Sequence, residues 1–214
     1  MLVKVLPTPT KPHYTFNLRD VSRVFQGIAK IRPEKLKSGE KMIKLWIHEC
    51  QKVFYDRLVN PKDRHVFFDL IIENMKIWYK TEYTEEEIYQ ANFIFGDFMN
   101  VTTREYDLIE DPQKLVKQIA EYMYDTPIQI ELFKDAVNHL VRCCRAIRFL
   151  RGNMLLIGVG GGGKKSTVTV AASMAGNVLA QIEPSKNYGL REFRREIFEK
   201  MLVPAGIEGR GVTF

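Results

Sequence analysis

The stretch NMLLIGVGGGGKKSTVTVAASMA, residues 153–175, decides the fold of this chain. An apolar run gives way to successive glycines and two lysines, and an alanine-rich run follows. The apolar run is typical of a strand buried on both faces of a parallel sheet, and a second such run, NVLAQIEP, comes after the alanine-rich segment. A charged helix, REFRREIFEKML, follows in turn. The order predicts a βαβ unit with the glycine loop at the carboxyl edge of its first strand.

The glycine loop follows the Walker A pattern of glycine, four residues, glycine and lysine. Glycine lets backbone N–H groups turn inward around an anion, and the lysine ammonium reaches the terminal phosphates. The helix that begins here adds the positive end of its dipole. We therefore predict a nucleotide-binding site formed by Gly158, Gly160, Gly161, Gly162, Gly163, Lys164, Lys165 and Ser166.

One position departs from this pattern. The residue after Lys164 should carry a hydroxyl group that contacts Mg²⁺, but it is Lys165, and Ser166 stands one place later. One helical step turns a side chain by about 100°, so Ser166 does not inherit the direction of the missing hydroxyl. Lys165 is either a second positive charge near the phosphates or a solvated surface lysine. The pattern predicts ATP or ADP as the ligand and leaves a Mg²⁺ contact open.

Composition narrows the classes of partner. The net charge of +6 is spread along the chain without a run of five like charges, so the signal for nucleic acid is weak and we expect no nucleic-acid partner. The three cysteines form no metal-binding spacing, and their odd number argues against a secreted disulfide framework. No apolar run approaches the roughly 20 residues of a membrane helix. We expect a protein of the reducing cytoplasm without membrane contact.

The chain before residue 92 is mostly helical by its apolar spacing. Two stripes recur at helical intervals: Leu18, Val21, Phe25 and Ile28 after Asn17, then Ile43, Ile47, Cys50, Phe54 and Leu58. A third helix is expected to begin at Asn60, with Pro61 in its first position and Asp63 completing the cap. Thr84 and Glu87 have the spacing of a capping box and predict a further short helix.

Beyond residue 91 the pattern changes. NFIFGDFM, residues 92–99, predicts a strand or an extended crossing segment. Asp111 and Pro112 predict a helix to about Tyr124. Residues 134–150 predict another helix, whose apolar positions are Ala136, Val137, Leu140, Cys144 and Ile147.

The stretches FKDAVNHLVRCCRAIRFLRGNMLLIGVGGGGKKS and QIEPSKNYGLREFRREI resemble the beginning of the fourth AAA+ module of dynein heavy chains, most closely the axonemal ones. In that family the loop also tends to place a residue without a hydroxyl group after its lysine and a serine next. Upstream, HYTFNLRDVSRVFQGI and LWIHECQKVFYDRLVNPKDR resemble the helical small subdomain that closes the third module, and FIFGDFM resembles the segment that joins the two.

The resemblance implies a fold class and a division of the chain. The fold class is α/β with an all-helical N-terminal part, namely a helical AAA+ small subdomain followed by an incomplete P-loop α/β sandwich. The small subdomain of the third module would occupy residues 1–91, a connecting segment 92–111, and the N-terminal part of the fourth module 112–214.

The resemblance also implies a function. The chain would be part of an ATP-driven, microtubule-based motor, with a nucleotide site, regulatory in role, that contributes to the motility of cilia or flagella. The implied partners are the other AAA+ modules of the same heavy chain and, through the whole protein, microtubules and dynein intermediate and light chains. The implied location is the cytoplasm and cytoskeleton, in the axoneme.

Three further residues have candidate roles in such a module. Arg19, in NLRD, falls where AAA+ small subdomains carry the sensor II arginine; the alternative is an arginine at a helix start that pairs with Asp20 or solvent. Ile130 and Leu132 precede the helix beside the loop, where they would either form one apolar face of an adenine pocket or belong to the core.

Hydrolysis in AAA+ proteins needs more than this loop. It also requires a Walker B acidic strand, a sensor and an arginine finger, and GRGVTF, residues 209–214, resembles only the opening of the Walker B strand. No catalytic residue is assigned, and we expect binding without turnover. The alternatives are an independent P-loop NTPase or kinase with a helical accessory domain, and a scaffold whose loop holds nucleotide structurally or not at all.

Overall fold

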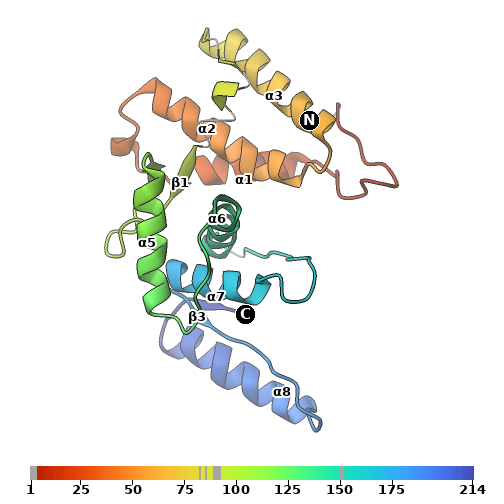
Figure 1. Cartoon of the computed structure of the whole chain (residues 1–214), viewed down its shortest axis with the longest axis vertical. Helices are drawn as coiled ribbons and strands as arrows, with labels where there is room; N and C mark the ends of the chain where they lie inside the picture. Colours follow the sequence, from red (N-terminus) through yellow and green to blue (C-terminus); the bar gives the residue numbers. More distant parts are fainter. Residues whose placement is uncertain (1–3, 82, 85, 89–92, 150–151) are drawn as a thin grey trace. The chain divides into compact units, whose positions relative to one another are not determined.

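The computed structural model describes residues 4–81, 83, 84, 86–88, 93–149 and 152–214. The chain divides into two compact units, Met1–Glu110 and Asp111–Phe214. Figure 1 shows their helices and strands in chain order. None of the helices described is both long enough and apolar enough to cross a lipid bilayer.

The first unit is built from helices and one small hairpin. Its elements are α1 (Leu18–Ile28), η1 (Pro33–Lys35), α2 (Gly39–Val53), η2 (Tyr55–Arg57), α3 (Pro61–Asn74), η3 (Met75–Tyr79), β1 (Ile94–Gly96) and β2 (Asp107–Ile109). The two strands pair antiparallel, with Ile94 opposite Ile109. The predicted strand in residues 92–99 is therefore confirmed as β1. Its partner β2 was not predicted, and the hairpin lies within the first unit.

Side-chain caps fix where the helices begin. The Asn17 carboxamide accepts a hydrogen bond from the backbone N–H of Arg19 at 2.9 Å. In the other direction, the Asp20 carboxylate accepts from Asn17 N–H at 3.1 Å, which completes a capping box. Asn60 accepts from Lys62 N–H at 3.0 Å and starts α3 as predicted. The predicted capping box of Thr84 with Glu87 is confirmed in both directions.

Asp63 does not complete the cap of α3, and this correction has a physical reason. Its carboxylate is paired with the Lys11 ammonium and accepts a hydrogen bond from the Tyr14 hydroxyl at 3.0 Å. The same Tyr14 oxygen accepts from Val59 N–H at 2.9 Å. Asp63 thus ties the segment before α1 to the start of α3, and it is unavailable to the helix N-terminus.

The buried face of α1 differs from the predicted stripe. Leu18 and Phe25 are 79% and 64% exposed, whereas Asp20, Val24 and Gly27 are buried. A salt bridge of 3.2 Å from Arg57 holds the buried Asp20 carboxylate. Apolar spacing missed Asp20 and Gly27 because an ion pair and a glycine contact bring α1 against its neighbours, in addition to the packing of Val24 and Ile28.

Helix α2 is the centre of the first unit. Ile43, Ile47 and Cys50 are buried as predicted, and Phe54 is half-buried just beyond the end of the helix. The opposite face is buried too. There Glu49 accepts from the Tyr106 hydroxyl at 2.5 Å, and a Cβ atom on Gly27 would overlap its carboxylate.

Helix α2 also buries His48 and Cys50. The His48 ring is fully buried, and its Nδ1–H donates to the Phe93 carbonyl at 2.6 Å. Burial, together with the neighbouring Glu49 charge, raises the pKa of the Cys50 thiol to about 12. Cys50 therefore packs as a neutral apolar side chain.

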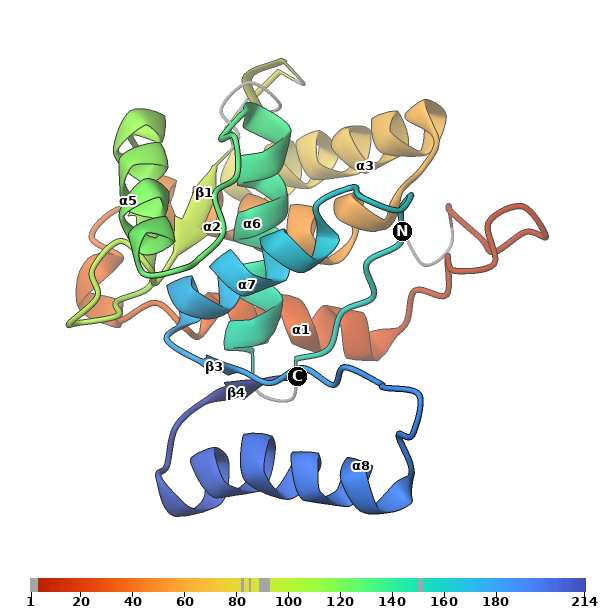
Figure 2. The ribbon, with the colours of Figure 1, turned by 60° about the horizontal axis from the view of Figure 1, so that its bottom comes forward.

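The second unit contains most of the predicted α/β elements. They are α5 (Pro112–Tyr124), α6 (Lys134–Arg148), α7 (Lys164–Ala175), β3 (Val178–Leu179), α8 (Leu190–Ile197), η4 (Phe198–Ile207) and β4 (Val212–Thr213). Strands β3 and β4 are parallel, with Val178 opposite Val212. Figure 2 shows the strands between α7 on one side and α8 on the other. This is a βαβ crossover, but it is not the predicted one, whose first strand would precede the glycine loop.

The predicted strand in residues 152–159 is wrong for this structure. The segment has no strand assignment, and Leu155, Ile157 and Val159 are 84%, 86% and 80% exposed. Strands β3 and β4, of two residues each, pair with one another, and neither pairs with this segment. Without a neighbouring strand, an apolar run gains neither ladder hydrogen bonds nor a covered face.

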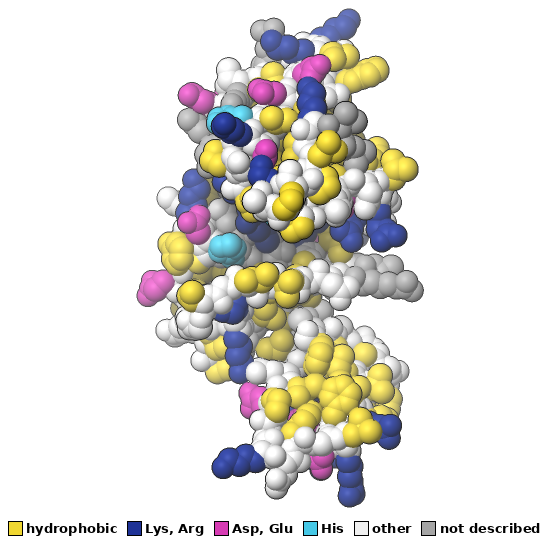
Figure 3. Space-filling view, turned by 90° about the vertical axis from the view of Figure 1, so that its right-hand side faces the viewer, with side chains coloured by type: hydrophobic (Ala, Val, Ile, Leu, Met, Phe, Trp, Pro, Cys, Tyr) yellow, Lys and Arg dark blue, Asp and Glu magenta, His cyan; other side chains and the backbone are white. Residues whose placement is uncertain are grey.

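The helical crossover from α8 into η4 is amphipathic. No residue of either element is buried. Its exposed large apolar side chains are Leu190, Phe193, Phe198, Leu202 and Ile207. Figure 3 shows apolar side chains gathered at the level of α8. Two strands of two residues each are too short to cover such a face.

We predict that Gly27→Ala destabilises the first unit by about 1–3 kcal/mol, because the added methyl group overlaps a buried carboxylate that is already hydrogen-bonded. Both tryptophans, Trp46 and Trp78, lie in this unit, so fluorescence during urea unfolding reports on it. Gly39→Ala, at a position with open space around the added carbon, is the matched control. Equal urea midpoints for Gly27→Ala and the parent would contradict the prediction.

The ion pair of Asp63 makes the stability of the first unit depend on pH. The hydrogen bond from Lys11 and that from Tyr14 hold the pKa of its carboxyl below the ordinary value of 3.8. Its stabilising contribution is therefore complete above the unfolded-state pKa and is lost as pH falls through the folded-state pKa. We expect Asp63→Asn to lower the urea midpoint at pH 7, and we expect the difference between the midpoints of variant and parent to be smaller at pH 3. The exposed Glu86→Gln should track the parent at both pH values; a constant difference for Asp63→Asn would refute this account.

Candidate functional site

Helix α7 positions the glycine loop. It begins at Lys164 and ends at Ala175, and glycines in the left-handed conformation flank it, Gly163 with φ of 73° and Gly176 with φ of 73°. Its buried residues are Val170, Ala171, Ala172, Met174 and Ala175. Small side chains let neighbouring helices approach closely. The first residues of α7, and the loop before them, are thereby anchored from one side.

The loop is a tight turn that glycine alone adopts without strain. Gly161 has φ of 74° and Gly163 has φ of 73°, in the region that L side chains avoid. Gly162 N–H donates to the Val159 carbonyl at 3.3 Å, which closes the turn. Thr167 donates to the Gly163 carbonyl through both its N–H and its hydroxyl, at 2.8 and 2.9 Å. The loop therefore leads directly into a regular first helical turn.

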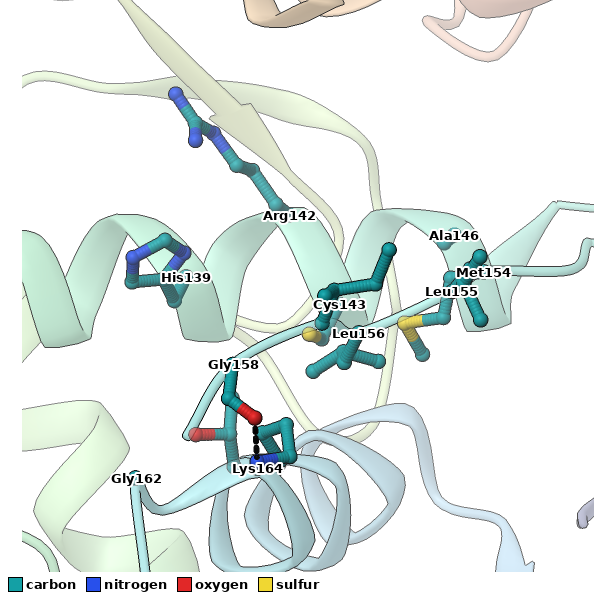
Figure 4. Close-up of a pocket in the computed structure, with 12 residues that line it drawn as sticks. His139, Arg142, Cys143, Ala146, Met154, Leu155, Leu156, Gly158, Gly162 and Lys164 are labelled. Carbon is teal, nitrogen blue, oxygen red and sulfur yellow. Dashed lines mark hydrogen bonds between the residues drawn. The ribbon is translucent and has the colours of Figure 1, made fainter. Parts of the chain in front are cut away.

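The Lys164 ammonium lies over this loop. It donates to the carbonyl oxygens of Gly158 and Val159, at 2.8 and 2.6 Å; Figure 4 shows the bond to Gly158. A lysine in this place brings a positive charge to the mouth of the loop, next to the N-terminus of α7. Together these groups place positive charge at the loop, as binding of an anion would require.

The two residues after Lys164 differ in their surroundings. The Lys165 ammonium pairs with Glu183 at 3.4 Å, and both side chains are largely exposed. Ser166 is half-buried. The sequence analysis did not select Thr167, although it lines the same cavity as Lys164. Its position three residues after the lysine, about one turn along α7, could have indicated that the two residues share a face. No cluster of His, Cys, Asp and Glu suited to a metal ion occurs among the described residues.

A cavity of about 380 Å³ opens beside the loop. Gly158, Gly162 and Lys164 line one end of it, and α6 forms a wall with His139, Arg142, Cys143 and Ala146. The segment before the loop supplies the other wall through residues 154–157. A smaller cavity, of about 250 Å³, lies on the other side of Lys164, toward β3.

The remaining predicted residues lie elsewhere. Ile130 and Leu132 are half-buried ahead of α6, and neither belongs to the lining of the two cavities. Arg19 is exposed in the first turn of α1, in the first unit. The adenine contact and the sensor II role stay predictions.

A loop of the pattern glycine, four residues, glycine and lysine that leads into a helix is typical of P-loop nucleotide-binding proteins. The comparisons with known families agree. Residues 128–214 match the family described as P-loop containing dynein motor region D4, and residues 1–91 match the AAA+ lid domain. The chain belongs to the dynein heavy chain family, which confirms the resemblance and its fold class.

Curated relatives give the same result. Mouse (Mus musculus) dynein axonemal heavy chain 1 is 40% identical over 99% of this chain. Human (Homo sapiens) dynein axonemal heavy chains 6 and 2 are 37% identical over 100% and 36% identical over 99%. The chain spans 5% of the length of each of these relatives.

The loop geometry predicts that glycine substitutions differ in their effect on phosphate affinity. Gly163→Ala makes the left-handed conformation unfavourable by about 1–2 kcal/mol, so the free loop should relax away from it; binding of inorganic tripolyphosphate must then restore it, at about a tenfold loss of affinity. Gly160→Ala, whose φ lies outside that region and whose surroundings are open, should keep the parent affinity. Calorimetric titration with tripolyphosphate measures both. Equal losses in the two variants would show that backbone conformation does not control the site.

Proposed function

We propose that this chain contributes a nucleotide-binding site of an axonemal dynein heavy chain, and that the site takes ATP or ADP. The phosphates would be held by the following residues: Gly158, Gly160, Gly161, Gly162, Gly163, Lys164, Lys165 and Ser166. The observation that carries the proposal is the loop itself, with two left-handed glycines, a lysine folded over its mouth and a helix N-terminus behind it. Its match to a P-loop dynein region supports the same assignment.

The chain would join two modules of the motor ring. We assign residues 1–91 to the lid of the third AAA+ module, 92–111 to the connecting segment, and 112–214 to the head of the fourth. The lid match to residues 1–91 and the D4 match from residue 128 support this division. A boundary between compact units at residues 110 and 111 is consistent with it.

The site would bind nucleotide without hydrolysing it in this chain alone. Phosphoryl transfer needs a group that orients the attacking water, in addition to positive charge around the phosphates. No carboxylate belongs to the described lining of either cavity beside Lys164. Glu183, the acidic residue paired with Lys165, is largely exposed in that ion pair. Bound nucleotide would then act as a regulator of the module.

In the whole protein this site would serve an ATP-driven motor on microtubules, in the axoneme of cilia or flagella. The partners would be the other AAA+ modules of the heavy chain and, through the rest of the protein, microtubules and intermediate and light chains. Ser166 would be the hydroxyl nearest to a bound Mg²⁺. Arg19 would act as sensor II toward the phosphates of the third module, and not toward this loop.

We predict that Lys164→Ala weakens ATP binding about ten- to a hundredfold, because it removes a charge-assisted hydrogen bond to phosphate. Arg19→Ala is the matched control among the basic residues and should leave the affinity of this chain unchanged. Calorimetric titration of both variants with ATP, and a phosphate-release assay on the same samples, measure binding and turnover. An equal loss in Arg19→Ala would contradict the module assignment, and measurable release by the parent would contradict binding without hydrolysis.

A further inference from the structure

The residue after the loop lysine normally helps a P-loop to hold Mg²⁺. In the Walker A pattern this residue carries a hydroxyl group, and here it is Lys165, the second residue of α7. A lysine ammonium has three donors and no acceptor, so it offers no lone pair to a metal ion. Mg²⁺ takes oxygen ligands in near-octahedral geometry. The loop therefore has a cation where a metal ligand would be needed.

The other hydroxyl groups at the start of α7 do not replace the missing one. Thr167 donates to the Gly163 carbonyl at 2.9 Å, and Thr169 donates to the Lys165 carbonyl at 3.0 Å. Both side chains thus lie back along the helix toward the residue four places earlier. Ser166 is half-buried, and its side chain leaves the helix about 100° away from that of Lys165.

Carboxylate ligands are also missing from the described surroundings of the loop. No Asp or Glu side chain belongs to the described lining of either cavity beside Lys164. The Glu183 carboxylate lies outside both linings and pairs with the Lys165 ammonium at 3.4 Å. An ammonium group in this place would repel a divalent cation. The described residues therefore do not fit Mg²⁺ at this loop.

The same lysine can supply the positive charge that Mg²⁺ gives to a bound nucleotide. Lys164 and Lys165 both line the cavity of about 250 Å³, at the N-terminus of α7. Two ammonium groups and the positive end of the helix dipole together compensate phosphate charge. The side chains of Lys165 and Glu183 are 63% and 73% exposed, and a surface ion pair of this kind is weak enough to exchange for a phosphate.

We propose that this loop binds ATP or ADP in its metal-free form, with the Lys165 ammonium in place of the Mg²⁺ ion. The inference rests on the proposed function and deepens it by naming the ionic form of the ligand and the residue that selects this form. Glu183 is the counterion of Lys165 in the absence of nucleotide, and phosphate displaces it.

Calorimetric titration of the parent chain with ATP tests the inference directly. One titration contains excess EDTA, and the other contains excess MgCl₂. We expect ATP to bind at least as tightly in EDTA as in MgCl₂, because the site gains charge compensation from Lys165 and no ligand contact from the metal. Tighter binding in MgCl₂ would overturn the inference.

Two substitutions at one position separate the charge from the hydroxyl group. Lys165→Ala and Lys165→Ser should each lose about tenfold in ATP affinity in EDTA, because both remove a charge-assisted contact to phosphate. In MgCl₂ the serine variant should recover affinity and the alanine variant should not, because only serine restores the metal ligand. Equal affinities of the two variants in MgCl₂ would contradict this account.

Lys186→Ser is the matched control for the loss of one positive charge. Lys186 is exposed and lies outside the lining of both cavities, so its variant should match the parent in both buffers. A tenfold loss in this control would show that net charge, and not the position of Lys165, determines the affinity. Far-UV circular dichroism checks that each variant is folded. If Lys165→Ser does not fold, the comparison of buffers for the parent still decides.

Glu183→Gln distinguishes a counterion from a metal ligand. Removal of the counterion frees Lys165, so ATP affinity in EDTA should rise about two- to fivefold, the range of a surface ion pair. A weaker affinity of this variant in MgCl₂, with no change in EDTA, would make Glu183 a metal ligand and overturn the inference.

The two buffers also distinguish this inference from the proposed function. If the parent binds ATP in neither buffer, the proposed nucleotide site and the inference both fail. If it binds ATP only in MgCl₂, the nucleotide site stands and the inference alone fails.

Discussion

The packing of α7 is the constraint on which the candidate site depends. The helix buries mainly alanines together with Val170 and Met174, so the neighbouring helices α5 and α6 approach it closely. The loop is the N-terminal continuation of this anchored helix. The segment before the loop is largely exposed and forms no strand. Lys164 holds that segment instead, through the carbonyl groups of Gly158 and Val159.

The first unit depends on a different kind of contact. Its central helix buries Glu49 against Gly27 and bonds it to Tyr106, so a charged group stands where apolar side chains would be expected. Burying a carboxylate is unfavourable unless it is hydrogen-bonded, which makes this contact specific for one arrangement of α1, α2 and the hairpin. Asp63 with Lys11 and Tyr14 does the same for the segment that precedes α1.

The dynein relationship connects these observations. Residues 1–91 match the AAA+ lid domain and residues 128–214 match a P-loop dynein region, and the residue after the loop lysine is Lys165 rather than one with a hydroxyl group. Lys165 occupies the usual hydroxyl position and pairs with Glu183 on the surface. The proposed binding of nucleotide without turnover would follow from this composition, because binding needs charge and shape whereas hydrolysis needs an oriented water as well.

The sequence by itself determined the helices, their caps and the loop. Asn60 with Pro61, Asp111 with Pro112 and the run from Gly158 to Lys164 are local signals, in which neighbouring residues satisfy one another and no distant contact is needed. Tertiary structure alone decided which face of α1 is buried, because Asp20 and Gly27 meet partners more than twenty residues away. It also placed Asp63 with Lys11 and Tyr14 rather than at the cap, and paired β2 with β1. Most clearly, it left NMLLIGV without a sheet: an apolar run encodes the tendency to form a strand, but a strand exists only where another strand completes its backbone hydrogen bonds.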